Sequence, residues 1–207
     1  MRTSLNRPYY ANKKAPSGLD IRVVEGATPV ISTSDLKAYL REVGYLEEPA
    51  TGILKDMIRS AMNRAKQYMN ACAGVETLEA RWQRVYTFAR LPYGPVKEII
   101  EVKQQAGDGT TRVLVEGSDY VVTGEQVKEI ELTTRSISLG NSTRGDESLI
   151  VTYKAGYDND SPYMPDIRMA VRMAAADMYM MRTSTVDGSM GRSAQNPFDI
   201  LASARLR

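Results

Sequence analysis

The chain has 207 residues, of which 43% are hydrophobic and 25% are charged, so it is long enough to bury a core in one or two domains. Its 27 lysines and arginines nearly balance 25 aspartates and glutamates, and a net charge of +2 excludes a protein that coats nucleic acid over its whole surface. Histidine is absent, which excludes Ser-His-Asp triads, Cys-His dyads and histidine-based zinc sites. We therefore expect no enzyme and no cofactor, and only local contact with nucleic acid.

Cysteine use and hydropathy indicate the compartment. The single cysteine, Cys72, cannot form an intramolecular disulfide, which suits a reducing environment. No apolar run approaches the roughly 20 residues of a membrane span, and the N-terminal sequence MRTSLNRPYYANKK lacks the apolar segment of a signal peptide. We expect a soluble protein made in the cytoplasm, with no membrane partner.

Residues 1–18 have neither helical nor strand periodicity, and they carry basic side chains without an acidic one. We interpret them as an extended basic arm. The basic residues of this arm are Arg2, Arg7, Lys13 and Lys14. A short strand is predicted next, around Ile21 to Val24.

Two helices are predicted before residue 75. Ser32 with Asp35 three residues later resembles a capping box, and it predicts a short helix to about Val43 that points Val43 inward. The second helix is amphipathic and is predicted from about Ala50 to Ala73, ended by Gly74. Cys72 falls on its buried face, which favours a core residue over a reactive thiol.

Residues 76–157 have the pattern of an antiparallel β module, because β-branched and aromatic runs are separated by short turns. The predicted strands are Arg84 to Ala89, Val96 to Val102, Thr111 to Val115, Tyr120 to Val122, Glu129 to Leu132 and Leu149 to Tyr153. The expected fold class is α+β: a small bundle of three main helices and a short C-terminal helix, with this module inserted. The helical domain would comprise residues 19–75 and 158–182.

The third main helix is predicted from Pro165 to about Arg182, and it has two apolar arcs instead of one. One arc can pack on the helix that begins near Ala50. The second arc is either further core or a subunit interface, since methionine fills irregular contacts. This second arc comprises Met169, Met173, Ala176 and Met180.

The remaining narrow face of this helix is basic and holds Arg168, Arg172 and Arg182. It is either a solvated face that pairs with nearby acids or a surface for phosphate backbone, which requires charge without sequence specificity. The same two interpretations apply to Lys13 and Lys14 of the arm. A third interpretation is that the arm docks on a partner protein. Residues 183–207 are interpreted as a flexible linker followed by a short amphipathic helix that starts near Asn196.

Two loops have weak resemblance to ligand sites. The loop from Asp158 to Asp160, with Asp166 nearby, is rich in carboxylates but lacks the glycine and distal glutamate of a calcium loop, which favours a solvated loop. The sequence from Gly107 to Gly109 lacks the helix and the Gly-Lys-Ser/Thr ending of a phosphate loop, which favours a hairpin turn. The segment 140–145 has the same weakness.

Several segments occur together in a recognisable order. They are Leu19 to Glu25, Pro29 to Arg41, the long helix with Ala61 and Ala65, Leu91-Pro92 with Pro95-Val96, Asp119 to Val122, and Ile150 to Tyr157 followed by Met164-Pro165 and Tyr179 to Arg182. Over residues 19–182 this order resembles the head-tail connector (adaptor, or head-completion) proteins of tailed bacteriophages, in particular a longer subgroup with a β insertion. The C-terminal segment is similar to that family's closing helix.

The resemblance implies a structural virion protein that is made in the cytoplasm of a host bacterium. It implies a homo-oligomeric ring, commonly of twelve subunits, that attaches to the portal protein, receives tail, stopper or tail-terminator proteins, and continues the channel for double-stranded DNA. The second methionine arc would then contact the neighbouring subunit, and the basic face with Lys13 and Lys14 would contact passing DNA. The residues predicted to dock on the portal are Pro197, Phe198, Ile200, Leu201 and Leu206. The alternative is a small DNA-binding module that uses the basic helix face.

Overall fold

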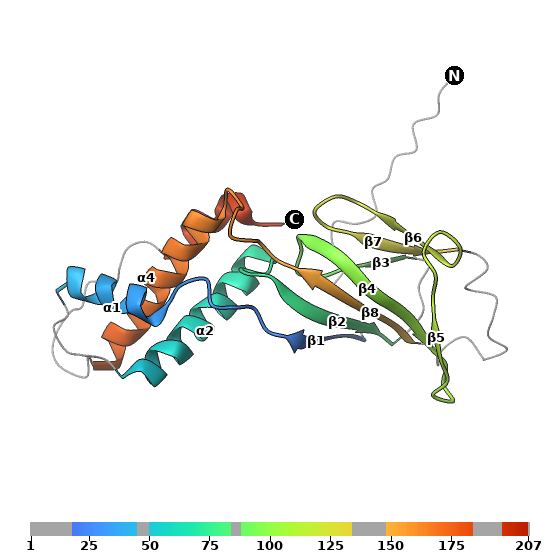
Figure 1. The fold of residues 1–207 in the computed structure, drawn as a ribbon, viewed down its shortest axis with the longest axis horizontal. Helices are drawn as coiled ribbons and strands as arrows, with labels where there is room; N and C mark the ends of the chain where they lie inside the picture. The colour runs from blue at the N-terminus through green and yellow to red at the C-terminus, as the bar shows by residue number, and fades with distance from the viewer. Residues whose placement is uncertain (1–17, 45–49, 84–87, 134–147, 184–195, 207) are drawn as a thin grey trace, which may run out of the picture.

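Helices gather at one end of the molecule and antiparallel strands at the other (Figure 1). The structure is a computed structural model that describes residues 18–44, 50–83, 88–133, 148–183 and 196–206, with the side chains of residues 182 and 183 excepted. The elements are β1 (Leu19–Glu25), α1 (Thr33–Glu42), α2 (Thr51–Met69), β2 (Glu76–Trp82), β3 (Phe88–Arg90), β4 (Val96–Gln105), β5 (Thr111–Val113), β6 (Tyr120–Thr123), β7 (Glu129–Leu132), β8 (Ser148–Ala155), α4 (Met164–Thr183) and the 3-10 helix η1 (Asp199–Ala204). The predicted combination of helices with antiparallel strands is confirmed.

The predicted capping box is present at the start of α1. The Ser32 hydroxyl accepts a hydrogen bond from the Asp35 backbone N–H at 3.0 Å, and the Asp35 carboxylate accepts one from the Ser32 backbone N–H at 3.0 Å. Leu36 and Leu40 are buried. Val43 is 47% exposed, contrary to the prediction, because the helix ends at Glu42 and Val43 is its C-cap.

Helix α2 ends four residues earlier than the sequence pattern predicts. Asn70 has a left-handed backbone (φ 53°) and its N–H donates to the Lys66 carbonyl, so the chain leaves the helix well before Gly74. Cys72 lies beyond the helix and is fully buried in the core of the β module. Its thiol donates to the Tyr93 carbonyl at 3.3 Å, and burial raises the pKa of the thiol. The prediction of a core cysteine is confirmed.

The strands form a five-stranded sheet in the order β1-β2-β8-β4-β5 and a three-stranded sheet in the order β3-β7-β6. The sequence pattern predicts no strand at Glu76–Trp82, yet this segment is β2 and joins the first strand of the chain to β8. The pairing of Ile21 with Ala80 therefore places β1 in the sheet, whereas the sequence grouped it with the helices. Long-range pairing decides this placement, which local periodicity does not encode.

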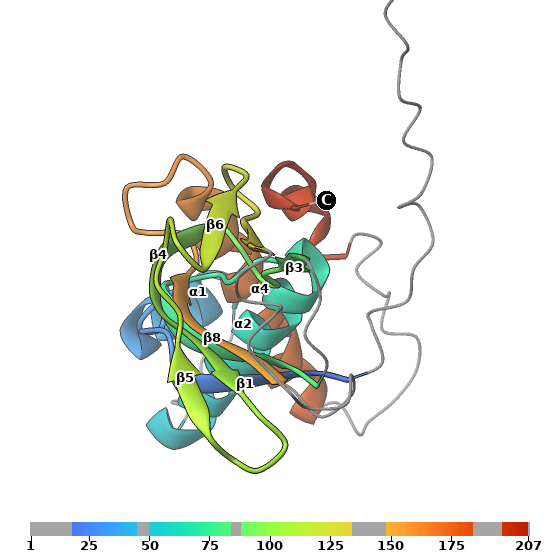
Figure 2. The same cartoon turned by 90° about the vertical axis from the view of Figure 1, so that its right-hand side faces the viewer.

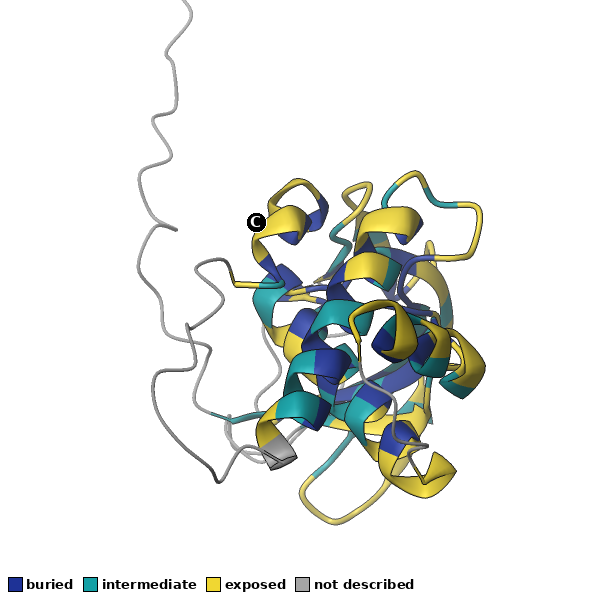
Figure 3. Cartoon of the chain, turned by 90° about the vertical axis from the view of Figure 1, so that its left-hand side faces the viewer, coloured by how far each residue is buried: buried dark blue, intermediate teal, exposed yellow. Residues whose placement is uncertain are grey.

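Two cores hold the molecule together. In the β module the two sheets enclose a cluster that includes Trp82, Ile130 and Tyr153, and the three-stranded sheet lies over one side of the larger sheet (Figure 2). In the helical part, the mutually facing sides of the helices are buried and their outer sides are exposed (Figure 3). Among the described helices, none combines the length and apolar character needed to cross a lipid bilayer.

Candidate assembly surface

Helix α4 packs against α1, α2 and η1, which decides which of its apolar side chains remain accessible. Ala176 is only 1% exposed and belongs to the helical core, so it is not accessible for a subunit contact in this conformation. Met180 is partly buried and packs against the same core. The second apolar arc therefore contributes mostly to the subunit's own interior at its C-terminal end.

The N-terminal half of the same arc faces outward. Met169 is 42% exposed, and Met173, one turn later, is half-buried. Side chains four residues apart on a helix are neighbours, so these two methionines form one small apolar patch. Met181 is 67% exposed, although the sequence pattern places it on the inward arc. Its exposure follows from its position in the last turn of α4, near the end of the described helix.

The basic face of α4 lies beside the start of α1. Arg168 Nη2 donates to Asn159 Oδ1 at 3.0 Å, and Arg172 is half-buried with its Nε enclosed and without an acceptor among the described atoms. The hydrogen bonds from Ser32 hold the pKa of Asp35 below its usual range, and the nearby charges of Arg172 and Arg168 lower it further. An amide oxygen thus holds the Arg168 guanidinium, and both arginines lie near the carboxylate of Asp35.

The side chains of the other predicted DNA contacts are not described by the structure. Lys13 and Lys14 lie outside the described residues, and so does the side chain of Arg182. The structure therefore brings together only Arg168 and Arg172 of the predicted basic set.

The C-terminal segment is part of the helical core. Phe198, Leu201 and Leu206 are 9%, 0% and 7% exposed, so these three predicted docking residues are not accessible in this conformation. Backbone contacts hold the segment in place, because the Leu206 N–H donates to the Met69 carbonyl at 2.9 Å. Of the predicted docking residues, Ile200 is 41% exposed and Pro197 is half-exposed, so these two remain accessible.

The two weak ligand motifs are ordinary loops. Asp158 pairs with Lys97 at 2.7 Å, and the described residues contain no group of three or more carboxylate, cysteine or histidine side chains suited to a metal ion. Gly107 to Gly109 lie in the hairpin between β4 and β5, where the Gly109 N–H donates to the Ala106 carbonyl at 2.9 Å. The predicted hairpin is confirmed there, and segment 140–145 lies outside the described residues.

Comparison with solved structures identifies the architecture. A chain from the "Neck of empty GTA particle computed with C6 symmetry" matches with a TM-score of 0.67, and the match covers 91% of this chain and 96% of that chain at 15% identity. The fold is shared with gene transfer agent neck chains. A chain from the "Virion of native gene transfer agent (GTA) particle" also has a TM-score of 0.67, with 14% identity and coverage of 90% and 96%.

A third match comes from the "Neck of native GTA particle computed with C12 symmetry", with a TM-score of 0.59, 14% identity and coverage of 88% and 96%. The three matched chains come from the neck or the virion of gene transfer agent particles. The resemblance to phage head-tail connectors is confirmed by this shared fold. No protein-family model matches the sequence, and no curated protein is significantly similar to it.

Proposed function

We propose that this chain is a structural subunit of a virion and that it occupies the neck between head and tail. The observation that carries the proposal is the match to gene transfer agent neck chains over nearly the full length of both partners. A match that covers 91% of this chain and 96% of the other is not limited to one common motif. A structural role also agrees with a sequence that contains no histidine.

The subunit forms a homo-oligomeric ring, with twelve copies as the expected number. The matched neck structures were computed with C6 and C12 symmetry, which supports a cyclic arrangement. A ring requires two different surfaces on each subunit that fit each other. The patch of Met169 and Met173 is one such surface, because it is apolar, accessible and carried by a rigid helix.

The ring binds the portal on one side and tail, stopper or tail-terminator proteins on the other, and it continues the DNA channel. Ile200, with Pro197 beside it, is the accessible part of the C-terminal segment for portal contact. A net charge of only +2 suits a passage through which double-stranded DNA moves without strong retention. Arg168, with Arg172 beside it, and the side chains of Arg182, Lys13 and Lys14 are the candidate phosphate contacts.

The molar mass of the purified protein tests this proposal, measured by multi-angle light scattering alone and after mixing with the portal protein of the same particle. We expect a portal-bound species with about one subunit per portal chain. The competing function is a DNA-binding module that uses the basic face of α4. A stable monomer or dimer without affinity for the portal, which binds DNA with a steep salt dependence, would establish that module and contradict the neck proposal.

A further inference from the structure

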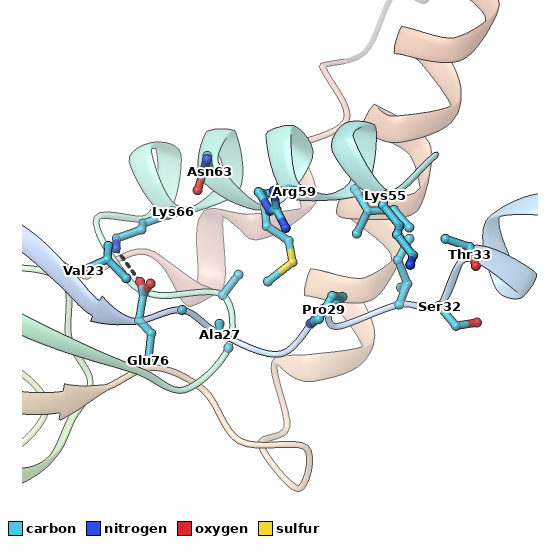
Figure 4. A pocket seen from close by; sticks show the side chains of 16 residues that line it. Val23, Ala27, Pro29, Ser32, Thr33, Lys55, Arg59, Asn63, Lys66 and Glu76 are labelled. Atoms are coloured by element: carbon cyan, nitrogen blue, oxygen red, sulfur yellow. Dashed lines mark hydrogen bonds and ion pairs between the residues drawn. The ribbon is translucent and has the colours of Figure 1, made fainter. Parts of the chain in front are cut away.

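A groove of about 430 Å³ lies between α2 and the segment that connects β1 to α1 (Figure 4). This volume falls within the roughly 300–1,000 Å³ that is usual for binding pockets. The α2 wall carries Lys55, Arg59, Asn63 and Lys66 along its length, and the opposite wall follows the chain from Val23 to Thr33. The groove is therefore elongated and open along one side of the helical part.

The groove has uncompensated positive charge on one wall. Lys55 and Arg59 are exposed, and neither makes an ion pair or hydrogen bond with another residue that the structure describes. Lys66 differs, because it forms an ion pair with Glu76 and its ammonium lies 4.6 Å from the centre of the Tyr93 ring. Among the described residues that line the groove, Glu76 is the only carboxylate and is already paired, whereas the two cations nearer to α1 have no acidic partner in this part of the chain.

The interior of the groove is apolar. Side chains from both walls contribute to it, among them Val23 and Pro29 on one side and Ile58 and Met62 on the other. Val23 pairs with Leu78 of β2, so its side chain lies on the same side of the sheet as the buried Leu78. Val23 is nevertheless 49% exposed. An apolar lining below a cationic rim fits an occupant that has both acidic and apolar side chains.

We propose that this groove binds an acidic segment of a partner protein in an extended conformation, with acidic and apolar side chains in alternation. The spacing supports an extended chain: Lys55 and Arg59 are one helical turn apart, about 6 Å. Alternate residues of an extended strand are about 6.6 Å apart. Acidic side chains at alternate positions therefore reach both cations, and the side chains between them point to the apolar interior.

Length and charge define the occupant further. The α2 wall from Lys55 to Lys66 is about 16 Å long, which corresponds to about five residues of an extended chain. The chain's own N-terminal arm, residues 1–17, is a poor occupant because it contains four basic residues and no acidic one. DNA offers negative charge but no aliphatic side chains for the apolar interior.

Fluorescence anisotropy with the full-length protein tests the proposal. The probe is a labelled peptide of alternating glutamate and valine, compared with peptides in which glutamine or lysine replaces glutamate. The variants Lys55→Glu and Arg59→Glu each reverse one charge of the groove. Arg64→Glu is the matched control, because Arg64 is an exposed cation of α2 that does not line the groove. An unchanged thermal unfolding midpoint shows that each variant is folded.

We expect the glutamate peptide to bind wild type and the Arg64→Glu variant equally, and to bind Lys55→Glu and Arg59→Glu about tenfold or more weakly. The glutamine and lysine peptides should bind weakly to all four proteins. Equal binding of the glutamate and glutamine peptides, or no effect of the groove variants, would overturn the proposal. Two other results would also overturn it. A short DNA duplex could compete with the peptide and lose its binding in the Lys55→Glu and Arg59→Glu variants, which would make DNA the occupant. Alternatively, these variants could change the molar mass of the protein itself, which would make a second copy of the chain the occupant.

Discussion

The hydroxyl of Tyr157 donates a buried hydrogen bond to the carbonyl oxygen of Ala204 at 2.8 Å. Tyr157 follows the last strand of the β module, and Ala204 ends η1. One hydrogen bond therefore connects the junction of the two parts of the fold to the C-terminal segment. Together with the bond between Leu206 and Met69, it explains why this segment is part of the core.

Replacing Tyr157 with phenylalanine should lower the free energy of unfolding by about 1–3 kcal/mol, because the Ala204 carbonyl would remain buried without its donor. Urea denaturation measures the difference. Tyr163→Phe is the matched control, since Tyr163 packs edge-on against Tyr157 but its hydroxyl has no hydrogen bond among the described residues. Equal losses in the two variants would contradict a specific role of the hydrogen bond.

Alkaline pH should destabilise the fold. Burial raises the pKa of Tyr157 to about 12, with a smaller contribution from Tyr163. The unfolded chain releases this proton near pH 10, so the free energy of unfolding should fall between about pH 10 and 12, by up to about 1.4 kcal/mol per pH unit. Burial also raises the pKa values of Tyr120 and Tyr153.

Urea denaturation at several pH values measures this slope. Tyr157→Phe should have a shallower slope than wild type over the same range, with the remainder due to the other two tyrosines and to the buried thiol of Cys72. A slope that does not change in the variant would show that Tyr157 ionises equally in both states.

Gly156 is required at the junction between β8 and the helical part. Its φ is +129°, and a Cβ atom there would lie 2.1 Å from the carbonyl oxygen of Gly74. Gly156→Ala should therefore cost about 3 kcal/mol or more in stability. Gly109→Ala should cost only about 1–2 kcal/mol, because Gly109 also has a positive φ but nothing lies within 4 Å of its added Cβ. Similar midpoints for the two variants in thermal unfolding would contradict the steric argument.

The ion pair between Lys66 and Glu76 is largely shielded from solvent, with side-chain exposures of 15% and 10%. Removing one partner, in Lys66→Met or Glu76→Leu, should cost about 3 kcal/mol because a charge is left without its partner. The double variant should lose less than the sum of the single losses. A double-mutant cycle in urea measures this coupling, and strictly additive losses would show that the two charges act independently.

The methionine patch on α4 should determine ring formation. In the double variant Met169→Glu with Met173→Glu, two new negative charges on the patch of each subunit would face the different surface of its neighbour without a partner, so we expect the ring to dissociate into folded monomers. Light scattering measures the molar mass, and circular dichroism checks the fold. Val121→Glu is the control, since Val121 is 45% exposed on the β module, away from α4. A ring that persists in the double variant would remove this patch from the interface.

Local sequence patterns predicted the elements whose conformation depends on nearby residues. The capping box of Ser32 and Asp35 predicted the start of α1, and β-branched runs predicted β7 at its observed bounds and most of β4, β6 and β8. The absence of histidine and the low net charge directed the interpretation toward structural proteins, and the order of motifs indicated the connector fold. These features are encoded in neighbouring residues, or in their order, and need no knowledge of packing.

Tertiary structure alone decided which apolar side chains remain accessible. Ala176 and Leu201 are apolar and were predicted to contact another subunit and the portal, but the packing of α4 and η1 on α2 buries them. The cationic groove likewise combines α2 with a segment more than twenty positions earlier, so no single stretch of sequence contains it. Periodicity shows that a helix has an apolar face, whereas burial depends on which distant element covers that face.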